Sequence, residues 1–192
     1  MTVKKSSRLW RKYRDVADTS KILTAVAVII SITALYQTAS ENPADTLEES
    51  LEQVEVVDGD TVETGNETYR LLGIDTPETY GESNPLEFGL EDTYTDRKCL
   101  KRYGRKATEF VKEKTRREDG QEIRMRTDPL ADERGTYGRL LTYMYTGGNT
   151  SINRKLLEKG YARLYDTRFS RREKFLEAEK NAKEQKLGLW SC

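Results

Sequence analysis

Two tight-turn signals stand close together in the chain, at Asp58-Gly59 and at Gly65-Asn66. Such dipeptides favour two-residue β-hairpin turns, because their residues tolerate the positive φ angles that these turns need. The valine-rich run 51–57 precedes the first turn, a second run begins at Asp60, and a third extends over 67–74. Short runs joined by two-residue turns predict three antiparallel strands in a meander.

The remainder of the chain predicts two more strands and three helices. The alternation in E-I-R-M-R and the aromatic-rich run L-L-T-Y-M-Y indicate strands over 121–127 and 139–145. Apolar residues at helical spacing indicate a helix over 99–117. A shorter helix is expected over 151–160, and a last one over about 170–186, where S-R-R-E fits a capping box. The expected fold class is α+β, with five short strands in a partly open barrel such as the OB-fold and about three helices.

The chain begins with a basic stretch that contains an apolar run. Residues 1–40 carry seven Lys/Arg and two Asp/Glu, net +5, and the apolar run 22–36 is fifteen residues long. A membrane-spanning helix needs about 20 apolar residues, so this run fits a signal peptide or a short signal anchor, with a buried core helix as the alternative. An acidic linker over 41–51 and one domain over 52–192 complete the expected organisation. Because the positive flank precedes the apolar run, the domain is expected to be extracytoplasmic, either secreted or anchored to the membrane.

Histidine is absent from the sequence, and only two cysteines are present. Ser-His-Asp and Cys-His catalysis, histidine-ligated metals and nucleases with a histidine base are therefore excluded, as is a four-cysteine zinc site. Export would permit a disulfide between Cys99 and Cys192, with two unpaired thiols as the alternative. Residues 56–192 carry 26 basic and 25 acidic residues, so overall charge does not indicate nucleic-acid binding, and any phosphate affinity must come from local clustering.

Two aspartates, Asp60 and Asp75, lie near the ends of the predicted strands. In an ideal hairpin around Gly65-Asn66, Asp60 lies opposite Leu71, and alternation puts both aspartates on one face. Two neighbouring carboxylates repel each other unless a proton or a cation lies between them. Because only oxygen donors are on offer, with a hydroxyl and a carbonyl from Thr76, the expected cation is Ca²⁺ before Mg²⁺. The alternative is that D-G-D-T serves the turn alone, an interpretation we accept for its first Asp-Gly pair.

Two arginines, Arg70 and Arg139, stand in otherwise apolar runs. A guanidinium there costs free energy unless it reaches solvent or an anion. The pair could clamp a phosphate, and structural salt bridges to acidic side chains are an equal alternative on these residues alone. Ideal alternation also places Arg70 on the face opposite Asp75, so a bulge or a strong twist is required for both to share a site.

Four ordered motifs carry a resemblance to a known family. V-V-D-G-D-T, Y-R-L-L-G-I-D-T-P-E, Y-G-R-L-L-T-Y and K-E-Q-K-L-G-L-W-S resemble the staphylococcal nuclease (thermonuclease-like) family over about residues 52–191. The resemblance implies a five-stranded OB barrel with three helices, and a calcium-dependent endonuclease that cleaves DNA and RNA phosphodiesters with low sequence specificity. The chain departs from the family in a short hairpin at Gly65-Asn66 and a long surface loop over 79–98. It also lacks the basic excess of the type enzyme, so weaker or more salt-dependent affinity is expected.

The resemblance also implies ligand and catalytic roles. Asp60 and Asp75 would bind Ca²⁺ through their carboxylates, and Thr76 would bind it through its backbone oxygen. Arg70 and Arg139 would hold the scissile phosphate and stabilise the charge that develops in the transition state.

Three more residues are assigned by the same resemblance. Glu78 would act as a general base or orient the attacking water. Tyr137 and Tyr165 match tyrosines that contact the nucleotide substrate.

Two other classes of function stay open. One is a catalytically silent nuclease-like OB module that binds nucleic acid or protein, and the other is a non-enzymatic surface protein stabilised by calcium. The enzyme is favoured, because all five polar residues of the implied site are present and a calcium-stabilised protein would have no use for both arginines. The expected partner is a DNA or RNA substrate, with a membrane contact only through 22–36. No obligate protein partner is expected, and the chain is expected to be a monomer.

Overall fold

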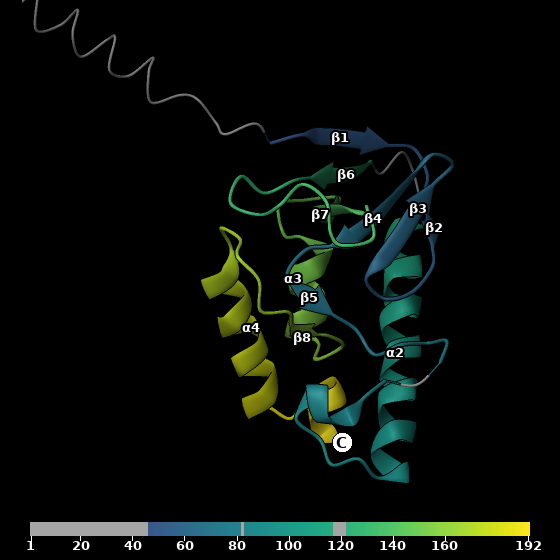
Figure 1. The fold of residues 1–192 in the computed structure, drawn as a ribbon, viewed down its shortest axis with the longest axis vertical. Helices are drawn as coiled ribbons and strands as arrows, with labels where there is room; N and C mark the ends of the chain where they lie inside the picture. The colour runs from purple at the N-terminus through teal and green to yellow at the C-terminus, as the bar shows by residue number, and fades with distance from the viewer. Residues whose placement is uncertain (1–45, 82, 117–121) are drawn as a thin grey trace, which may run out of the picture. The chain divides into compact units, whose positions relative to one another are not determined.

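Six strands form one mixed sheet in the order β1-β6-β7-β4-β3-β2, and a small second sheet pairs β5 with β8 (Figure 1). The computed structural model describes residues 46–81, 83–116 and 122–192. The large sheet contains β1 Glu48–Leu51, β2 Glu55–Val56, β3 Thr61–Thr64, β4 Glu67–Leu71, β6 Ile123–Arg126 and β7 Leu140–Thr146. The small sheet contains β5 Ile74–Asp75 and β8 Arg163–Leu164. β4 and β7 pair in parallel, whereas the other pairs are antiparallel.

The two predicted turns have different outcomes. The turn at Gly65-Asn66 is confirmed, because Thr64 pairs with Glu67 on either side of it. The turn at Asp58-Gly59 is wider than the predicted two-residue hairpin, and Val57 N donates to Thr61 O at 3.1 Å across it. Asp60 therefore lies in a loop and not at the start of a strand.

The predicted third strand over 67–74 is divided into β4 and β5. β4 ends at Leu71 and β5 begins at Ile74 in a different sheet. Gly73 has φ +75° at the break, and a Cβ there would lie 2.5 Å from the ring of Phe169. Only glycine adopts this backbone geometry with a neighbour so close. The division changes which side chains of this segment share a face.

Three α-helices lie in the described part of the chain: α2 Tyr94–Thr115, α3 Ile152–Glu158 and α4 Arg172–Glu184. α2 begins five residues before the predicted start at 99, because the Thr93 hydroxyl accepts from Asp96 N and caps a polar first turn. The predicted capping box at Ser170 is wrong, since the N-cap of α4 is Arg171 with no side-chain cap. In Figure 1, α3 lies between α2 and α4. Two short 3₁₀ helices, η1 Pro85–Phe88 and η2 Gly188–Ser191, complete the elements.

The core lies between the strands and the apolar faces of α2 and α3. Its members Leu71, Ile74, Val111, Met144 and Leu156 are each 1% exposed or less. Burying one such side chain stabilises the fold by about 1.5–3 kcal/mol before conformational entropy is subtracted. This packing sets α2 and α3 firmly against the segment that carries Asp75 and Thr76.

Asn153 at the start of α3 is fully buried and joins three elements. Its Nδ2 donates to Leu72 O and Thr142 O at 3.0 Å each, and its Oδ1 accepts from Met144 N at 3.0 Å. These bonds satisfy Leu72 O, the carbonyl left unpaired where β4 ends. The break before Gly73 is thus held by a buried side chain.

Asp128, after β6, holds the beginning of α4. It accepts from Tyr143 Oη at 2.6 Å, from Leu130 N at 2.8 Å, and from both the backbone N and the hydroxyl of Ser170. Burial acts to raise the pKa of Asp128, but these donors outweigh it and hold the pKa below its usual value. Ser170 therefore bonds to this carboxylate and is not available as a helix cap.

A disulfide joins Cys99 of α2 to Cys192 after η2, so the paired alternative is the one in the structure. Phe88, Leu100, Tyr103 and Leu189 pack as a second buried cluster beside it. The bond and the cluster fix the carboxyl-terminal segment and η1 against the amino-terminal half of α2.

The structure describes only the last part of the predicted amino-terminal segments. The apolar run 22–36 and the rest of 1–45 lie outside the described residues. Glu48–Leu51, expected in the acidic linker, form β1, where the Glu48 carboxylate pairs with Arg124 and Arg126 of β6. None of the helices that the structure describes has the length and apolarity to cross a membrane.

Candidate active site

Asp60 is buried in the loop between β2 and β3. It is 1% exposed, and its Oδ2 accepts from Thr76 N at 2.8 Å while its Oδ1 accepts from the Thr61 hydroxyl at 3.2 Å. Leu71 N donates to Asp60 O at 2.8 Å, so the predicted position opposite Leu71 is confirmed. The side chain is therefore tied directly to the segment that follows β5.

Arg70 brings the two aspartates together. Its Nη1 contacts Asp60 Oδ1, and its Nη2 donates to Asp75 Oδ1 at 2.8 Å. The predicted difficulty, that alternation would hold Arg70 and Asp75 on opposite faces, is removed by the break at Gly73. Because β5 starts anew in a second sheet, the pleat of β4 does not dictate the direction of Asp75.

Glu78 and Thr76 are positioned by close packing against α2. Thr76 is 5% exposed, and Glu78 N donates to Ser83 Oγ at 2.7 Å. A Cβ at Gly104 of α2 would collide with Pro77 O. Glycine at this position therefore lets the helix lie directly against the backbone that leads to Glu78.

The electrostatic environment of Glu78 favours a carboxyl that takes up a proton more readily than usual. Partial desolvation raises the pKa of Glu78, and the nearby carboxylates of Asp58 and Asp75 raise it further, against the effects of Arg70 and Arg139. A general base works best when its pKa approaches the working pH. The direction of the shift therefore suits the base role that the resemblance implies.

Arg139, just before β7, carries an unsatisfied guanidinium. Its Nε is buried and has no hydrogen-bond partner, and its one hydrogen bond among the described residues is from Nη1 to the Thr61 hydroxyl at 3.5 Å. No carboxylate of the described residues forms an ion pair with it, so the structural salt-bridge alternative holds for Arg70 and not for Arg139. Tyr137 is 83% exposed with its ring centroid 5.5 Å from Arg139 Cζ. A cation and an aromatic ring thus face solvent beside the Asp60 loop.

The donor set suits a hard divalent cation. Asp60 and Asp75 both contact the Arg70 guanidinium, so the two carboxylates lie close to one shared positive charge. The available ligands are all oxygens, the class that Ca²⁺ and Mg²⁺ prefer. No group of three or more Asp, Glu, Cys or His side chains arranged for a metal occurs among residues 46–81, 83–116 and 122–192. A metal here would therefore depend on two carboxylates completed by Thr76 and water.

Comparison with known proteins shows the family of the chain. The model of the family described as staphylococcal nuclease homologue matches residues 68–192. The chain belongs to the staphylococcal nuclease family. The matched region contains Arg70, Asp75, Glu78 and Arg139, whereas Asp60 lies before it.

Individual relatives extend the match. An uncharacterized protein of Methanocaldococcus jannaschii is 38% identical over 147 residues, covering 72% of this chain and 70% of the relative. The thermonuclease of Staphylococcus hyicus is 28% identical over 184 residues, covering 90% and 97%. A prophage-derived endonuclease of Bacillus subtilis is 34% identical over 142 residues, covering 70% of this chain but 42% of the relative. The family therefore includes nucleases that share nearly the full length of this chain.

The structure adds two residues that the sequence analysis did not assign to the site. Asp58 does make the turn, since its Oδ1 accepts from Asp60 N at 3.0 Å, but its charge also acts on Glu78 and Arg70. Burial raises the pKa of Asp58, and Arg70 opposes that shift. The spacing of the two aspartates in D-G-D was the signal available for this role of Asp58. It was missed because Asp58 was assigned to the turn alone.

The second added residue is Arg163 of β8. Its Nε donates to Asp75 Oδ2 at 2.9 Å and its Nη2 to Glu87 of η1 at 3.0 Å, so it joins Asp75 to the long loop. No local sequence pattern marks this arginine, because its partners are distant in sequence. Tyr165, two residues on, is 50% exposed, and its backbone N donates to Gly73 O. The described contacts do not join the Tyr165 ring to the group around Arg70.

Proposed function

We propose that this chain is a calcium-dependent phosphodiesterase that cleaves DNA or RNA with low sequence specificity. The observation that carries the proposal is the unneutralised, partly buried Arg139 guanidinium beside the cluster of Asp60, Arg70, Asp75 and Glu78. An unpaired guanidinium in a partly buried position is costly without an anion, and a phosphate would satisfy it bidentately.

The residues of the site would divide the work as follows. Asp60, Asp75 and the Thr76 backbone oxygen would hold Ca²⁺, which when bound polarises a phosphoryl oxygen and neutralises charge. Arg139 would hold the scissile phosphate. Arg70 has five N–H donors, and two of its nitrogens contact Asp60 and Asp75. Its remaining donors would bind the same phosphate as Arg139.

Glu78 would deprotonate or orient the water that attacks phosphorus. Its raised pKa brings it nearer to neutral pH than an exposed glutamate, and the packing of Gly104 against Pro77 fixes the backbone that carries it. Tyr137 would lie along the base or sugar next to the phosphate, since its exposed ring adjoins Arg139. For Tyr165 the proposal rests on the family resemblance alone.

We also propose that the strands close into the five-stranded OB barrel expected for the family. β1 and β2 stand at opposite edges of the sheet order, yet only three residues of chain, 52–54, separate them. One sharply bent strand could therefore supply both edges. The domain would then extend over 52–192 with β1 joined to it, after a linker that begins near 41.

An extracytoplasmic location, secreted or anchored through 22–36, is proposed on two grounds. The basic flank and apolar run have the order of an export signal. The Cys99–Cys192 disulfide is the kind of bond that persists in oxidising compartments.

The arginine role is tested by substituting Arg139→Lys, with Arg154→Lys as the matched control. Arg154 is a half-exposed α3 residue that pairs with Glu158 and is given no role in the site. Loss of a key electrostatic donor lowers kcat about 10²–10³-fold. We expect a loss of that size for Arg139→Lys in a single-stranded DNA cleavage assay, and none for the control. Equal rates for both variants would contradict the phosphate role, and binding of DNA without cleavage by the unaltered chain would favour a silent module.

A further inference from the structure

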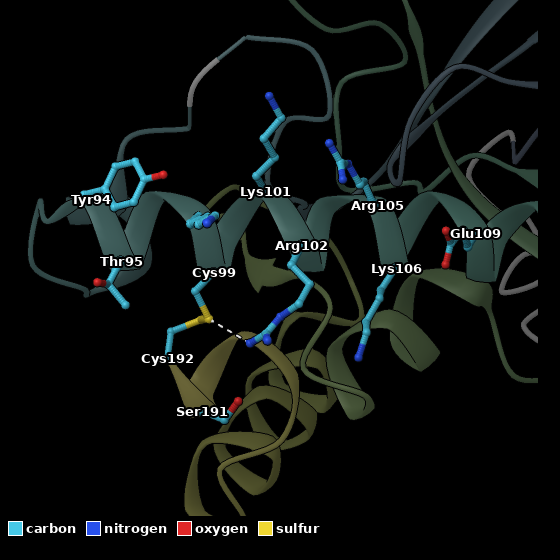
Figure 2. Close-up of a pocket in the computed structure, with 11 residues that line it drawn as sticks. Tyr94, Thr95, Cys99, Lys101, Arg102, Arg105, Lys106, Glu109, Ser191 and Cys192 are labelled. Atoms are coloured by element: carbon cyan, nitrogen blue, oxygen red, sulfur yellow. Dashed lines mark hydrogen bonds between the residues drawn. A yellow bond between two sulfur atoms is a disulfide. The ribbon is translucent and has the colours of Figure 1, made fainter.

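One face of α2 is strongly basic. Lys98, Lys101, Arg102, Arg105 and Lys106 are all exposed and follow the spacing i, i+3, i+4, i+7, i+8, which places them on one broad arc of the helix surface. Figure 2 shows Lys101 and Arg105 extending from one side of the helix axis, and Arg102 and Lys106 extending toward the side of the disulfide. We call these five residues the α2 basic face.

Among the described residues, the α2 basic face is not paired with acidic side chains, although Glu109 of the same helix lines the same cavity. Within the described parts of the chain, none of its five members forms a salt bridge, whereas Lys114 and Arg154 on helices are paired with acidic neighbours. α2 carries eight Lys/Arg and three Asp/Glu, net +5, in a chain with 33 of each. Like charges at i, i+4 destabilise a helix by about 0.2–0.5 kcal/mol per pair. The concentration of charge therefore favours an anionic ligand over a structural role.

Two adjoining cavities connect the α2 basic face to Glu78. The larger, about 980 Å³, is lined by all five basic residues together with Tyr94 and the disulfide. The smaller, about 260 Å³, is lined by Glu78 and shares Tyr94, Lys98 and Lys101 with the first. A polyanion whose scissile phosphate lies beside Glu78 would thus continue along α2 without leaving the basic surface.

Tyr94 at the shared wall indicates that the polyanion has unpaired bases. It is 76% exposed, and Lys98 Nζ lies 5.5 Å from its ring centroid. Exposed aromatic rings in a basic groove stack single-stranded bases. A duplex keeps its bases stacked on each other and would leave this ring unused.

We propose that the α2 basic face binds the single-stranded nucleic acid that extends beyond the phosphate held by Arg139, next to Glu78. The assignment of Glu78 as the point of entry rests on the proposed nuclease function. Lys98 and Lys106 are eight residues apart, about 12 Å along a helix, which is longer than one nucleotide of a strand. The face therefore contributes to oligonucleotides and not to a dinucleotide.

The test is the charge reversal Arg105→Glu/Lys106→Glu in the full chain. Of the two adjoining cavities, both residues line the larger, and neither lines the one that Glu78 lines. The matched control is Lys174→Glu/Lys180→Glu, which makes the same charge change at exposed positions of α4. Binding of a fluorescent 12-nucleotide single strand is measured in chelator, where no cleavage is needed, over a range of salt concentrations. The basic residues near the amino terminus are common to all variants.

We expect the slope of log K against log salt to fall by about 1.4 for two lost contacts, at about 0.7 per phosphate. This change in slope means that the charge-reversed variant should bind about 25-fold more weakly than the unaltered chain at 0.1 M salt, if the two bind equally at 1 M salt. The control should bind like the unaltered chain, Tyr94→Ala should also weaken binding, and cleavage of a dinucleotide with Ca²⁺ should be the same in all variants.

Equal salt slopes for the charge reversal and its control would overturn the inference. So would duplex binding as tight as single-strand binding and unchanged by Tyr94→Ala. A third contrary result is a charge reversal that abolishes binding to anionic phosphatidylglycerol vesicles and leaves oligonucleotide binding intact. The last result would assign the face to a membrane. Oligonucleotide binding that depends on the α2 basic face, without any cleavage in Ca²⁺, would refute the proposed nuclease function and leave this inference standing.

Discussion

Replacing Arg70 by methionine should destabilise the fold, because it removes the cation that joins Asp60 to Asp75. The Asp60 side chain is 2% exposed and that of Arg70 is 18% exposed. Removing one partner of a buried ion pair costs about 3–5 kcal/mol. Asp60 keeps its bonds from Thr76 N and the Thr61 hydroxyl, so we expect the lower end, about 3 kcal/mol.

Urea denaturation of the unaltered chain and of Arg70→Met, in chelator and in excess Ca²⁺, measures this cost and its relation to the metal. At a calcium concentration 100 times the Kd, binding adds about 2.7 kcal/mol of stability. The gain should be larger in Arg70→Met, whose carboxylates are released from the guanidinium. Adding Asp60→Asn should recover part of the cost in chelator, because the uncompensated buried charge is then removed. A cost below about 1 kcal/mol, or an equal calcium gain in both proteins, would refute this reasoning.

Two further predictions concern stability. Asp128 has a lowered pKa in the folded state, so its contribution is present above the unfolded pKa of about 3.9 and lost as pH falls through the lower folded value. Thermal denaturation between pH 5 and about pH 2 should therefore show a weaker acid dependence for Asp128→Asn than for the unaltered chain, and parallel curves would contradict this. Replacing Cys99 and Cys192 by serine opens a loop with a sequence separation of 93 and should cost about 4.6 kcal/mol by the chain-entropy estimate, measured by urea denaturation. A loss below about 1 kcal/mol would contradict that estimate.

The meander was predictable because its information is local. The Gly65-Asn66 turn fixes the register of β3 and β4, and from that register alone Asp60 falls opposite Leu71, as the structure has it. The helices over 151–160 and 170–186 were likewise indicated by spacing and end signals. The start of α4 differs from the predicted one, because Asp128, distant in sequence, engages Ser170.

The approach of Arg70 to Asp75 was not predictable from periodicity. Alternation assumes an unbroken strand through 67–74, whereas the turn at Gly73 starts a new sheet with β8. β8 has two residues and no signature of its own, so neither the small sheet nor Arg163 could be inferred. The start of α2 was missed for a related reason, since its first turn is polar and carries no apolar period.

Cleavage of a single-stranded oligonucleotide by the full chain, in Ca²⁺ and in chelator, is the most direct test of whether this chain is a calcium-dependent nuclease. The same assay with Glu78→Gln keeps the size of the side chain but removes the base. We expect cleavage in Ca²⁺, no cleavage in chelator, and a cleavage rate about 10²–10⁴-fold lower for Glu78→Gln. Cleavage that persists in chelator, or a Glu78→Gln variant as fast as the unaltered chain, would contradict it.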